Sequence, residues 1–156
     1  MKNLALTSLP SDKLSMLART LEVEQERRAA ANRLKSYRPY PKQAEFHKAG
    51  ASCTERLLRA GNQQGKTLAG GMEMAMHLTG RYPGWWQGRR FDQPVEAWAA
   101  CDTGENTRDN PQRVLMGSVG AIGTGSIPAD AIVEHWMGRG VANLMDTVLV
   151  RHVSGD

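Results

Sequence analysis

The feature that most constrains this chain is the run Ala60-Gly61-Asn62-Gln63-Gln64-Gly65-Lys66-Thr67. It matches the phosphate-binding pattern G-x-x-x-x-G-K-[ST], except that alanine replaces the first glycine. In such a loop, successive backbone N–H groups turn inward toward phosphate oxygens, and the following helix adds its positive end. The residues expected to bind a nucleotide here are Gly61, Asn62, Gln63, Gln64, Gly65, Lys66 and Thr67.

Two side chains of this run have distinct expected roles. Lys66 would reach the β- and γ-phosphates and is the one candidate catalytic residue, whereas the Thr67 hydroxyl would hold Mg²⁺. Gly65 would let the backbone approach the phosphates without a Cβ clash. The run therefore predicts a site for ATP and Mg²⁺. The alternative, a plain turn before a helix with an exposed lysine, stays open because short motifs match by chance.

The segment just before this loop offers a contact for a base. A glutamine can accept from the exocyclic amine of adenine and donate to a ring nitrogen, and Gln43 stands in the run Tyr37-Arg38-Pro39-Tyr40-Pro41-Lys42-Gln43. Tyr37 or Tyr40 could stack on the ring. The alternative for Gln43 is a solvated side chain.

Hydrophobic patterning alternates between expected strands and helices. Such alternation is typical of an α/β fold with a largely parallel sheet. Pro111 is expected to kink the helix that ends at Met116, or to restart it with Asn110 as cap. An N-terminal helix is expected from Ser11 to about Lys35, capped by Ser8 or Ser11 and supported by a Glu24–Arg28 pair. Strands are expected over 55–60, 95–101 and 146–153; helices over 42–48, 66–79 and 128–137; and loops over 80–94 and 117–125.

Composition excludes several classes of protein. The chain has 156 residues, and no apolar run is long enough to cross a bilayer, so no membrane partner is expected. Cys53 and Cys101 have no CxxC partner, which argues against a disulfide scaffold or a zinc ribbon. The histidines show no ligand spacing and are expected in the core or on the surface. Residues 1–66 hold 13 basic and 6 acidic side chains, a balance that suits a phosphate ligand or nucleic acid, although a solvated helix face explains it equally.

With its phosphate-loop motif and the preceding Gln43 segment, the sequence resembles the N-terminal ATPase domain of the terminase large subunit, the DNA-packaging motor of tailed bacteriophages. The resemblance covers most of residues 33–153. It implies a RecA-like P-loop fold (a three-layer arrangement with a mostly parallel sheet), in which Gln43 contacts adenine and Lys66 and Thr67 are the Walker A pair. The segments that carry it are 37–46, 59–71, 82–91 with its core Gly84-Trp85-Trp86-Gln87-Gly88-Arg89-Arg90, and 95–104.

The resemblance also implies a function for the full-length protein. Members couple ATP hydrolysis to translocation of double-stranded DNA into a procapsid, in the cytoplasm of the host bacterium. Their expected partners are double-stranded DNA, the small terminase subunit and the portal of the procapsid. For this chain the implied organisation is an N-terminal helical segment, 1–36, followed by a P-loop ATPase domain, 37–156, with a possible homo-oligomer.

Two departures from the family pattern shape the expected activity. Ala60 replaces the first loop glycine, and no apolar strand ending in Asp-Glu, the Walker B element, is present. The nuclease carboxylates are missing as well. We therefore expect the domain to be incomplete at its C-terminus and its hydrolysis of ATP to be absent or slow. An unfinished sheet would leave strand 146–153 as an edge through which copies self-associate.

Alternatives from other functional classes remain open. The chain could be a non-catalytic remnant or a module that binds a partner through helix 11–35. It could also be a small, complete P-loop enzyme that uses Asp102 for its metal. Trp85 and Trp86, next to Arg89 and Arg90, could grip nucleic acid, but burial of the Trp pair is favoured. The arginines that could act on a γ-phosphate are Arg59, Arg108, Arg113 and Arg139.

Overall fold

The computed structural model describes residues 13, 15–22 and 32–155, and the chain divides into two units, Met1–Ala31 and Asn32–Asp156. In the first unit, residues 13 and 15–22 are helical. The expected caps at Ser8 and Ser11 and the Glu24–Arg28 pair lie outside the described residues. The expectation of one helix running to about Lys35 is wrong, because Asn32 leaves the helical conformation at φ −77° and ψ 82°.

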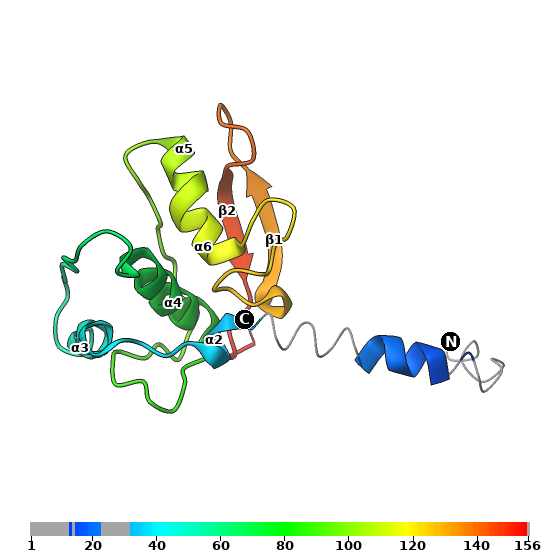
Figure 1. Ribbon diagram of the computed structural model, residues 1–156, viewed down its shortest axis with the longest axis horizontal. Helices are drawn as coiled ribbons and strands as arrows, with labels where there is room; N and C mark the ends of the chain where they lie inside the picture. Colours follow the sequence, from blue (N-terminus) through cyan, green and yellow to red (C-terminus); the bar gives the residue numbers. More distant parts are fainter. Residues whose placement is uncertain (1–12, 14, 23–31, 156) are drawn as a thin grey trace. The chain divides into compact units, whose positions relative to one another are not determined.

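The second unit contains short helices followed by a hairpin. Figure 1 shows α4 lying between α3 and the α5–α6 path, with the β1–β2 hairpin beside α6. None of the described helices is long and apolar enough to cross a bilayer. The elements are α2 (Arg33–Ser36), α3 (Pro41–Ala49), α4 (Lys66–Thr79), α5 (Gly104–Thr107), a π-helical turn η1 (Arg108–Gln112), α6 (Arg113–Met116), a 3₁₀ turn η2 (Ala129–Ala131), β1 (Ile132–Met137) and β2 (Met145–Val150).

Helix α3 confirms the expected helix over 42–48, and local chemistry explains where it begins. Tyr40 is extended, and Pro41 occupies the first helical turn, where a missing N–H costs nothing. The Gln43 side chain returns to accept a hydrogen bond from the backbone N–H of Tyr40 at 3.0 Å. This side-chain bond to the backbone fixes the turn that precedes the helix.

Helix α4 is the central element of the core and confirms the expected helix over 66–79. Left-handed glycines bound it, with φ +72° at Gly65 and +69° at Gly80. Its buried apolar side chains recur at helical spacing, as an amphipathic helix requires. The buried apolar cluster contains Leu34, Tyr37, Met72, Ala75, Met76, Trp86, Leu115, Met116, Ile127 and Ala131.

The path from α5 to α6 passes through Pro111 without breaking. Thr103 caps its start by accepting from the backbone N–H of Asn106 at 3.2 Å. Pro111 lies inside the π-helical turn, whose wider ring accommodates a residue that cannot donate an N–H. Of the two alternatives expected at Pro111, the restart with Asn110 as cap is not formed, because the Asn110 side chain donates to the Asn106 carbonyl at 3.1 Å.

The hairpin corrects one expectation and confirms most of another. Residues 132–137, expected as the end of a short helix, form β1, whose β-branched start at Ile132-Val133 suits a strand. Strand β2 begins at Met145, one residue before the strand expected over 146–153, and otherwise lies within it. It pairs with β1 in the antiparallel direction. The register places Ile132 opposite Val150 and His135 opposite Val148, with irregularities near both ends of β1.

The largely parallel, RecA-like sheet is not present in the described part of the chain, where the one sheet has two antiparallel strands. The expected strands at 55–60 and 95–101 are extended segments outside any sheet. Neither residues 54–60 nor residues 94–100 make a backbone–backbone hydrogen bond in that part of the chain. Their local propensity is therefore realised as extended backbone, but the neighbouring strands that would make a sheet are missing.

One buried amide joins the helical path to the hairpin, and its removal should destabilise the fold. Gln112 donates to the Asn143 carbonyl at 2.8 Å and accepts from the Met145 N–H at 2.8 Å. We expect Gln112→Ala to lower the free energy of unfolding by about 1–3 kcal/mol, because both backbone groups lose their partner. Chemical denaturation measures this, with the exposed Gln87→Ala as control. Equal stabilities of the two variants would contradict the prediction.

Candidate functional site

The predicted phosphate loop forms a tight turn that leads directly into α4. Gln63 has φ +59° and Gly65 φ +72°, so the backbone passes twice through the left-handed region. Ala60 has no positive φ, which explains why a side chain is tolerated at the position of the first motif glycine. No side chain caps α4, so side chains leave its first N–H groups available to a ligand.

Lys66 closes the loop on itself. Its Nζ donates to the carbonyl oxygens of Ala60 and Gly61, both at 2.7 Å. The ammonium group is thereby held over the loop, at the start of the helix whose positive end faces the same place. Thr67 follows on the first turn and is exposed. The predicted residues Gly61, Gly65, Lys66 and Thr67 therefore all lie at the start of α4.

Gln43 reaches the phosphate loop from α3. Its Nε2 donates to the carbonyl oxygens of Gln64 at 3.4 Å and Gly65 at 3.3 Å, and the residue is 5% exposed. Its Oε1 accepts from the Tyr40 N–H. A base could bind this amide only by replacing some of these bonds. The expected contact between Gln43 and adenine stays a prediction, but the nearness of Gln43 to the loop is a fact of the fold.

A buried carboxylate that sequence reasoning missed lies on α4, two turns beyond Lys66. Glu73 accepts from Nδ1 of His47 at 2.7 Å and from Nε2 of His77 at 3.3 Å. Arg56 donates to both of its oxygens, at 2.5 and 3.2 Å. These four donors join α3, the extended segment 54–60 and α4 through one group.

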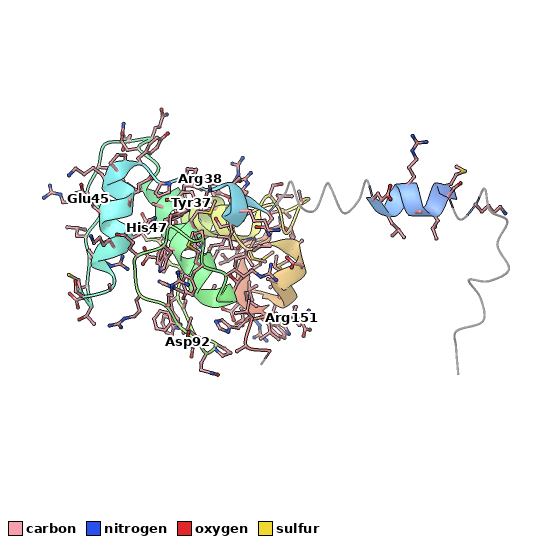
Figure 2. All side chains as sticks on the ribbon, turned by 90° about the horizontal axis from the view of Figure 1, so that it is seen from below. Tyr37, Arg38, Glu45, His47, Asp92 and Arg151 are labelled. Atoms are coloured by element: carbon pink, nitrogen blue, oxygen red, sulfur yellow. The ribbon has the colours of Figure 1, made fainter. Side chains whose placement is uncertain are left out.

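Hydrogen bonds extend this Glu73 cluster in both directions. On one side, Tyr37 Oη lies 3.0 Å from His47 Nε2, which connects the segment before α3. On the other, His77 Nδ1 lies 3.0 Å from Tyr82 Oη, which accepts from the Phe91 N–H at 2.9 Å. Figure 2 shows Tyr37 and His47 on the side of α3 toward the rest of the unit, and Glu45 on the opposite side.

The environment of Glu73 favours its charged form. Burial alone would raise the pKa of the carboxyl, but the hydrogen bonds from His47, His77 and Arg56, with the positive charge of Arg56, hold that pKa far below its usual range. Burial, reinforced by the Glu73 charge, raises the pKa of Tyr37 to about 12. The cluster therefore combines an ionised carboxylate with neutral phenols at neutral pH.

The aromatic residues of the site are distributed differently from some expectations. Tyr37 is 7% exposed and packs against Trp85 with ring centroids 5.9 Å apart, whereas Tyr40 is 70% exposed. Tyr40 is thus the tyrosine whose ring is available to a base. Trp86 is 5% exposed, and its Nε1 donates to the Arg89 carbonyl at 3.0 Å. The favoured burial is confirmed for Trp86, while Trp85 is half-buried.

Two clefts are lined in part by residues of the Glu73 cluster. One, of about 470 Å³, is lined by Arg38, Pro39, Ala44, His47, Trp85 and Gln87. The other, of about 450 Å³, lies against α4 between the extended segments, with Arg56, Glu73 and His77 in its lining. The first cleft includes Arg38 and Pro39, which belong to the segment 37–43 that is predicted to contact a base.

The remaining candidates are not gathered at the phosphate loop by any described contact. Asp102 is exposed and accepts from the Thr103 N–H at 3.0 Å and from Asn106 Nδ2 at 2.8 Å. Arg108 pairs with Asp109 at 2.7 Å. Arg59, Arg113 and Arg139 are exposed. Among the described residues, no three acidic, histidine or cysteine side chains form a group that could hold a metal ion.

A sequence signal for the Glu73 cluster exists. Glu73 and His77 stand four residues apart in the methionine-rich stretch 72–77, on a helix face that is otherwise apolar. A charged residue on such a face needs a partner. His47 and Arg56 could not have been identified as partners, because only the fold brings them to α4.

Comparison with known proteins supports the predicted resemblance. The chain is 37% identical over 166 aligned positions to a protein of Salmonella phage P22 described as "Terminase, large subunit". The alignment covers 97% of this chain, which spans about a third (33%) of the length of that relative. The resemblance to a terminase large subunit is thereby confirmed. No family model matches the chain, and no solved structure matches it.

The two glycines of the phosphate loop should differ sharply in their tolerance of a side chain. A Cβ at Gly65 would lie 2.9 Å from Gln43 Nε2 on a left-handed backbone, whereas one at Gly61 would meet only Gln64 Cγ at 3.7 Å. We expect Gly65→Ala to destabilise the fold by about 1–2 kcal/mol through the left-handed backbone alone. Gly61→Ala should be near neutral. Thermal unfolding of both variants tests this, and equal losses would contradict it.

The depressed pKa of Glu73 predicts a specific loss of stability in acid. A carboxyl whose pKa is lowered by folding contributes stability above its unfolded pKa, near 4.5, and loses it as pH falls below that value. Glu73→Gln should lower the free energy of unfolding at pH 7 by about 3–5 kcal/mol, because it breaks a buried charge cluster. It should also flatten the dependence of stability on pH between about pH 5 and pH 2.

The matched control is Glu45→Gln. Glu45 pairs with Lys42 at 2.8 Å, and the two side chains are 65% and 86% exposed. Such surface pairs contribute about 0–1 kcal/mol, so this variant should retain the acid slope of the wild type. Denaturant titrations of all three proteins from pH 7 to pH 2 measure the difference. A Glu73→Gln slope identical to the wild-type slope would refute the role assigned to the carboxylate.

Proposed function

We propose that this chain is the nucleotide-binding part of a terminase-type DNA-packaging motor and binds Mg-ATP at the loop Ala60–Thr67. The observation that carries the proposal is the arrangement at the start of α4. A tight loop with two left-handed residues leads into a helix without a side-chain cap, and Lys66 is held over it. Similarity to the phage P22 large subunit supports the same assignment.

The phosphates would replace the bonds that Lys66 now makes to its own loop. The Lys66 ammonium has two carbonyl partners in the free chain, and a triphosphate offers stronger, charged acceptors. The N–H groups of Gly61, Asn62, Gln63, Gln64 and Gly65 would add neutral donors around the phosphate oxygens. Lys66 then acts on the β- and γ-phosphates, and its catalytic contribution is electrostatic.

The base would lie on the α3 side of the loop. Arg38 and Pro39 line the cleft of about 470 Å³, and Tyr40 exposes its ring nearby in the sequence. Gln43 would contribute through its amide, which already lies beside the loop carbonyls. On binding, the Gln43 amide would give up a hydrogen bond to a loop carbonyl and form one to the base. One side chain would then contact both the base and the phosphate loop.

Mg²⁺ would be held by the Thr67 hydroxyl together with phosphate oxygens. A P-loop site commonly gains its second protein ligand from a carboxylate after an apolar strand. Among the described residues, no three acidic, histidine or cysteine side chains form a group that could hold a metal ion on its own, so the nucleotide would have to supply most of the ligands. We therefore propose ATP binding for this chain, and ATP hydrolysis with movement of double-stranded DNA for the whole large subunit. The small subunit and the procapsid portal would be partners of that larger protein.

Titration calorimetry of Mg-ATP into the full chain tests the proposal. We expect saturable binding at one site, weakened about tenfold to a hundredfold in Lys66→Ala, because an ammonium–phosphate contact is lost. Lys42→Ala is the control, since its exposed ammonium pairs with Glu45. Circular dichroism shows whether each variant is folded. Equal affinity of the Lys66 and Lys42 variants for Mg-ATP would disprove the assignment of the loop.

A further inference from the structure

A chain of hydrogen-bonding groups leads from the buried Glu73 carboxylate to the glutamine that is expected to contact a base. Nδ1 of His47 lies 2.7 Å from Glu73 Oε2, and Nε2 of the same ring lies 3.0 Å from Tyr37 Oη. The Tyr37 hydroxyl in turn lies 3.5 Å from Gln43 Oε1. His47 is 1% exposed and Gln43 is 5% exposed, so this chain of groups passes through the interior.

The donors and acceptors decide where the hydrogens of these groups lie. Burial would raise the pKa of Glu73, but the hydrogen bonds it accepts hold that pKa far below its usual range, so the carboxylate can only accept. Nδ1 of His47 therefore carries a hydrogen, and Nε2 of the neutral imidazole is an acceptor. Burial raises the pKa of Tyr37 to about 12, so the phenol keeps its hydrogen. Because Nε2 is the nearer acceptor, the hydroxyl donates to His47 and not to Gln43.

The amide of Gln43 is held in one orientation. Its Oε1 accepts from the Tyr40 N–H at 3.0 Å, and its Nε2 donates to the carbonyl oxygens of Gln64 and Gly65. A reversed amide would place donor against donor at Tyr40 and acceptor against acceptor at the loop. Because an amide oxygen can accept two hydrogen bonds, Oε1 keeps one acceptor site open as long as the Tyr37 hydroxyl donates elsewhere.

Aromatic packing holds the His47 ring in the orientation that both of its hydrogen bonds need. The ring centroids of Trp85 and Trp86 lie 6.3 Å and 5.2 Å from that of His47. The Tyr37 ring stands edge-on to it, with centroids 6.0 Å apart and an interplanar angle of 80°. If the imidazole were turned over, carbon atoms would take the places of its nitrogens, and both hydrogen bonds would be lost.

We propose that His47 is a positioning residue for base selection: by accepting the Tyr37 hydroxyl hydrogen, it keeps Gln43 Oε1 free to accept from the amino group of a purine. The inference rests on the proposed ATP site, in which Gln43 contacts the base, and it adds the residue that makes this contact selective. A base with a carbonyl oxygen in place of the amino group would bring a second acceptor against Oε1. Without the His47 acceptor, the Tyr37 hydroxyl would turn to Gln43 and occupy the same site on Oε1.

One substitution in the full chain tests this role. His47→Asn keeps an amide N–H near the position of Nδ1 for Glu73, but it removes the acceptor at the position of Nε2. We expect Mg-ATP to bind about tenfold more weakly, because the base loses a hydrogen bond to a buried acceptor. Magnesium tripolyphosphate, which has no base, should bind with unchanged affinity. The preference for Mg-ATP over Mg-inosine triphosphate, whose base carries a carbonyl oxygen in place of the amino group, should fall; titration calorimetry measures all three ligands.

A second substitution distinguishes this positioning role from general support of the fold. Adding Tyr37→Phe to His47→Asn removes the hydroxyl that would compete for Gln43, so the preference for Mg-ATP over Mg-inosine triphosphate should return to its wild-type value. A merely structural role would give no such recovery. His77→Asn is the matched control, because His77 Nε2 lies 3.3 Å from the Glu73 carboxylate at the other end of the cluster, and it should leave the preference unchanged. No recovery in the double variant, or equal losses in His47→Asn and His77→Asn, would overturn the proposal.

A measurement on the unsubstituted chain covers variants that do not fold. ¹⁵N NMR of the histidine rings reports which ring nitrogen carries the hydrogen, and we expect Nδ1 for His47; a hydrogen on Nε2 overturns the proposal. If the unsubstituted chain binds neither Mg-ATP nor tripolyphosphate, the nucleotide site itself is refuted, and this inference with it. If it binds Mg-ATP and a folded His47→Asn variant keeps the full preference, only the role of His47 is refuted.

Discussion

The Glu73 carboxylate is the group on which the arrangement of the site depends. It is buried and its environment favours the charged form, and its two oxygens accept hydrogen bonds from three different segments: from His47 of α3, from Arg56 of the extended segment 54–60 and from His77 of its own helix. A buried charge without partners is strongly unfavourable, so these segments must come together around it. α3 and the extended segment 54–60 that leads into the phosphate loop are thereby fixed relative to α4.

This constraint reaches the phosphate loop from two directions. Arg56 lies on the segment that enters the loop, and Glu73 lies on the helix that leaves it, so their ion pair holds the two ends of the turn. Gln43, one turn before His47 on α3, closes the same arrangement at Gln64 and Gly65. A loop of small and polar residues acquires one conformation because the elements on both sides are held by charge and hydrogen bonds.

The sequence was sufficient to predict those elements whose conformation is decided by neighbouring residues. The helices expected over 42–48 and 66–79 correspond to α3 and α4, whose ends are set locally by Pro41 and by the left-handed Gly65 and Gly80. The sheet could not be predicted this way, because residues 55–60 and 95–101 have strand propensity but find no partner among the described residues. The stretch 132–137 was wrongly expected to be helical, since a short apolar run has no clear period and pairing with β2 decided its state. In the site, the loop motif identified Lys66 and Thr67, whereas His47 and Arg56 required knowledge of the fold.

The bonds that Lys66 makes to its own loop have a consequence for ligand choice. A cation that is already solvated by two carbonyl oxygens at 2.7 Å does not attract every passing anion, because any ligand must first compete with those oxygens. Chloride or a single carboxylate offers little more than the loop itself, while a chain of linked phosphates offers several charged oxygens to Lys66 and to the neighbouring N–H groups at once. If the loop binds a nucleotide as proposed, these two bonds would make it favour polyphosphates over weaker anions.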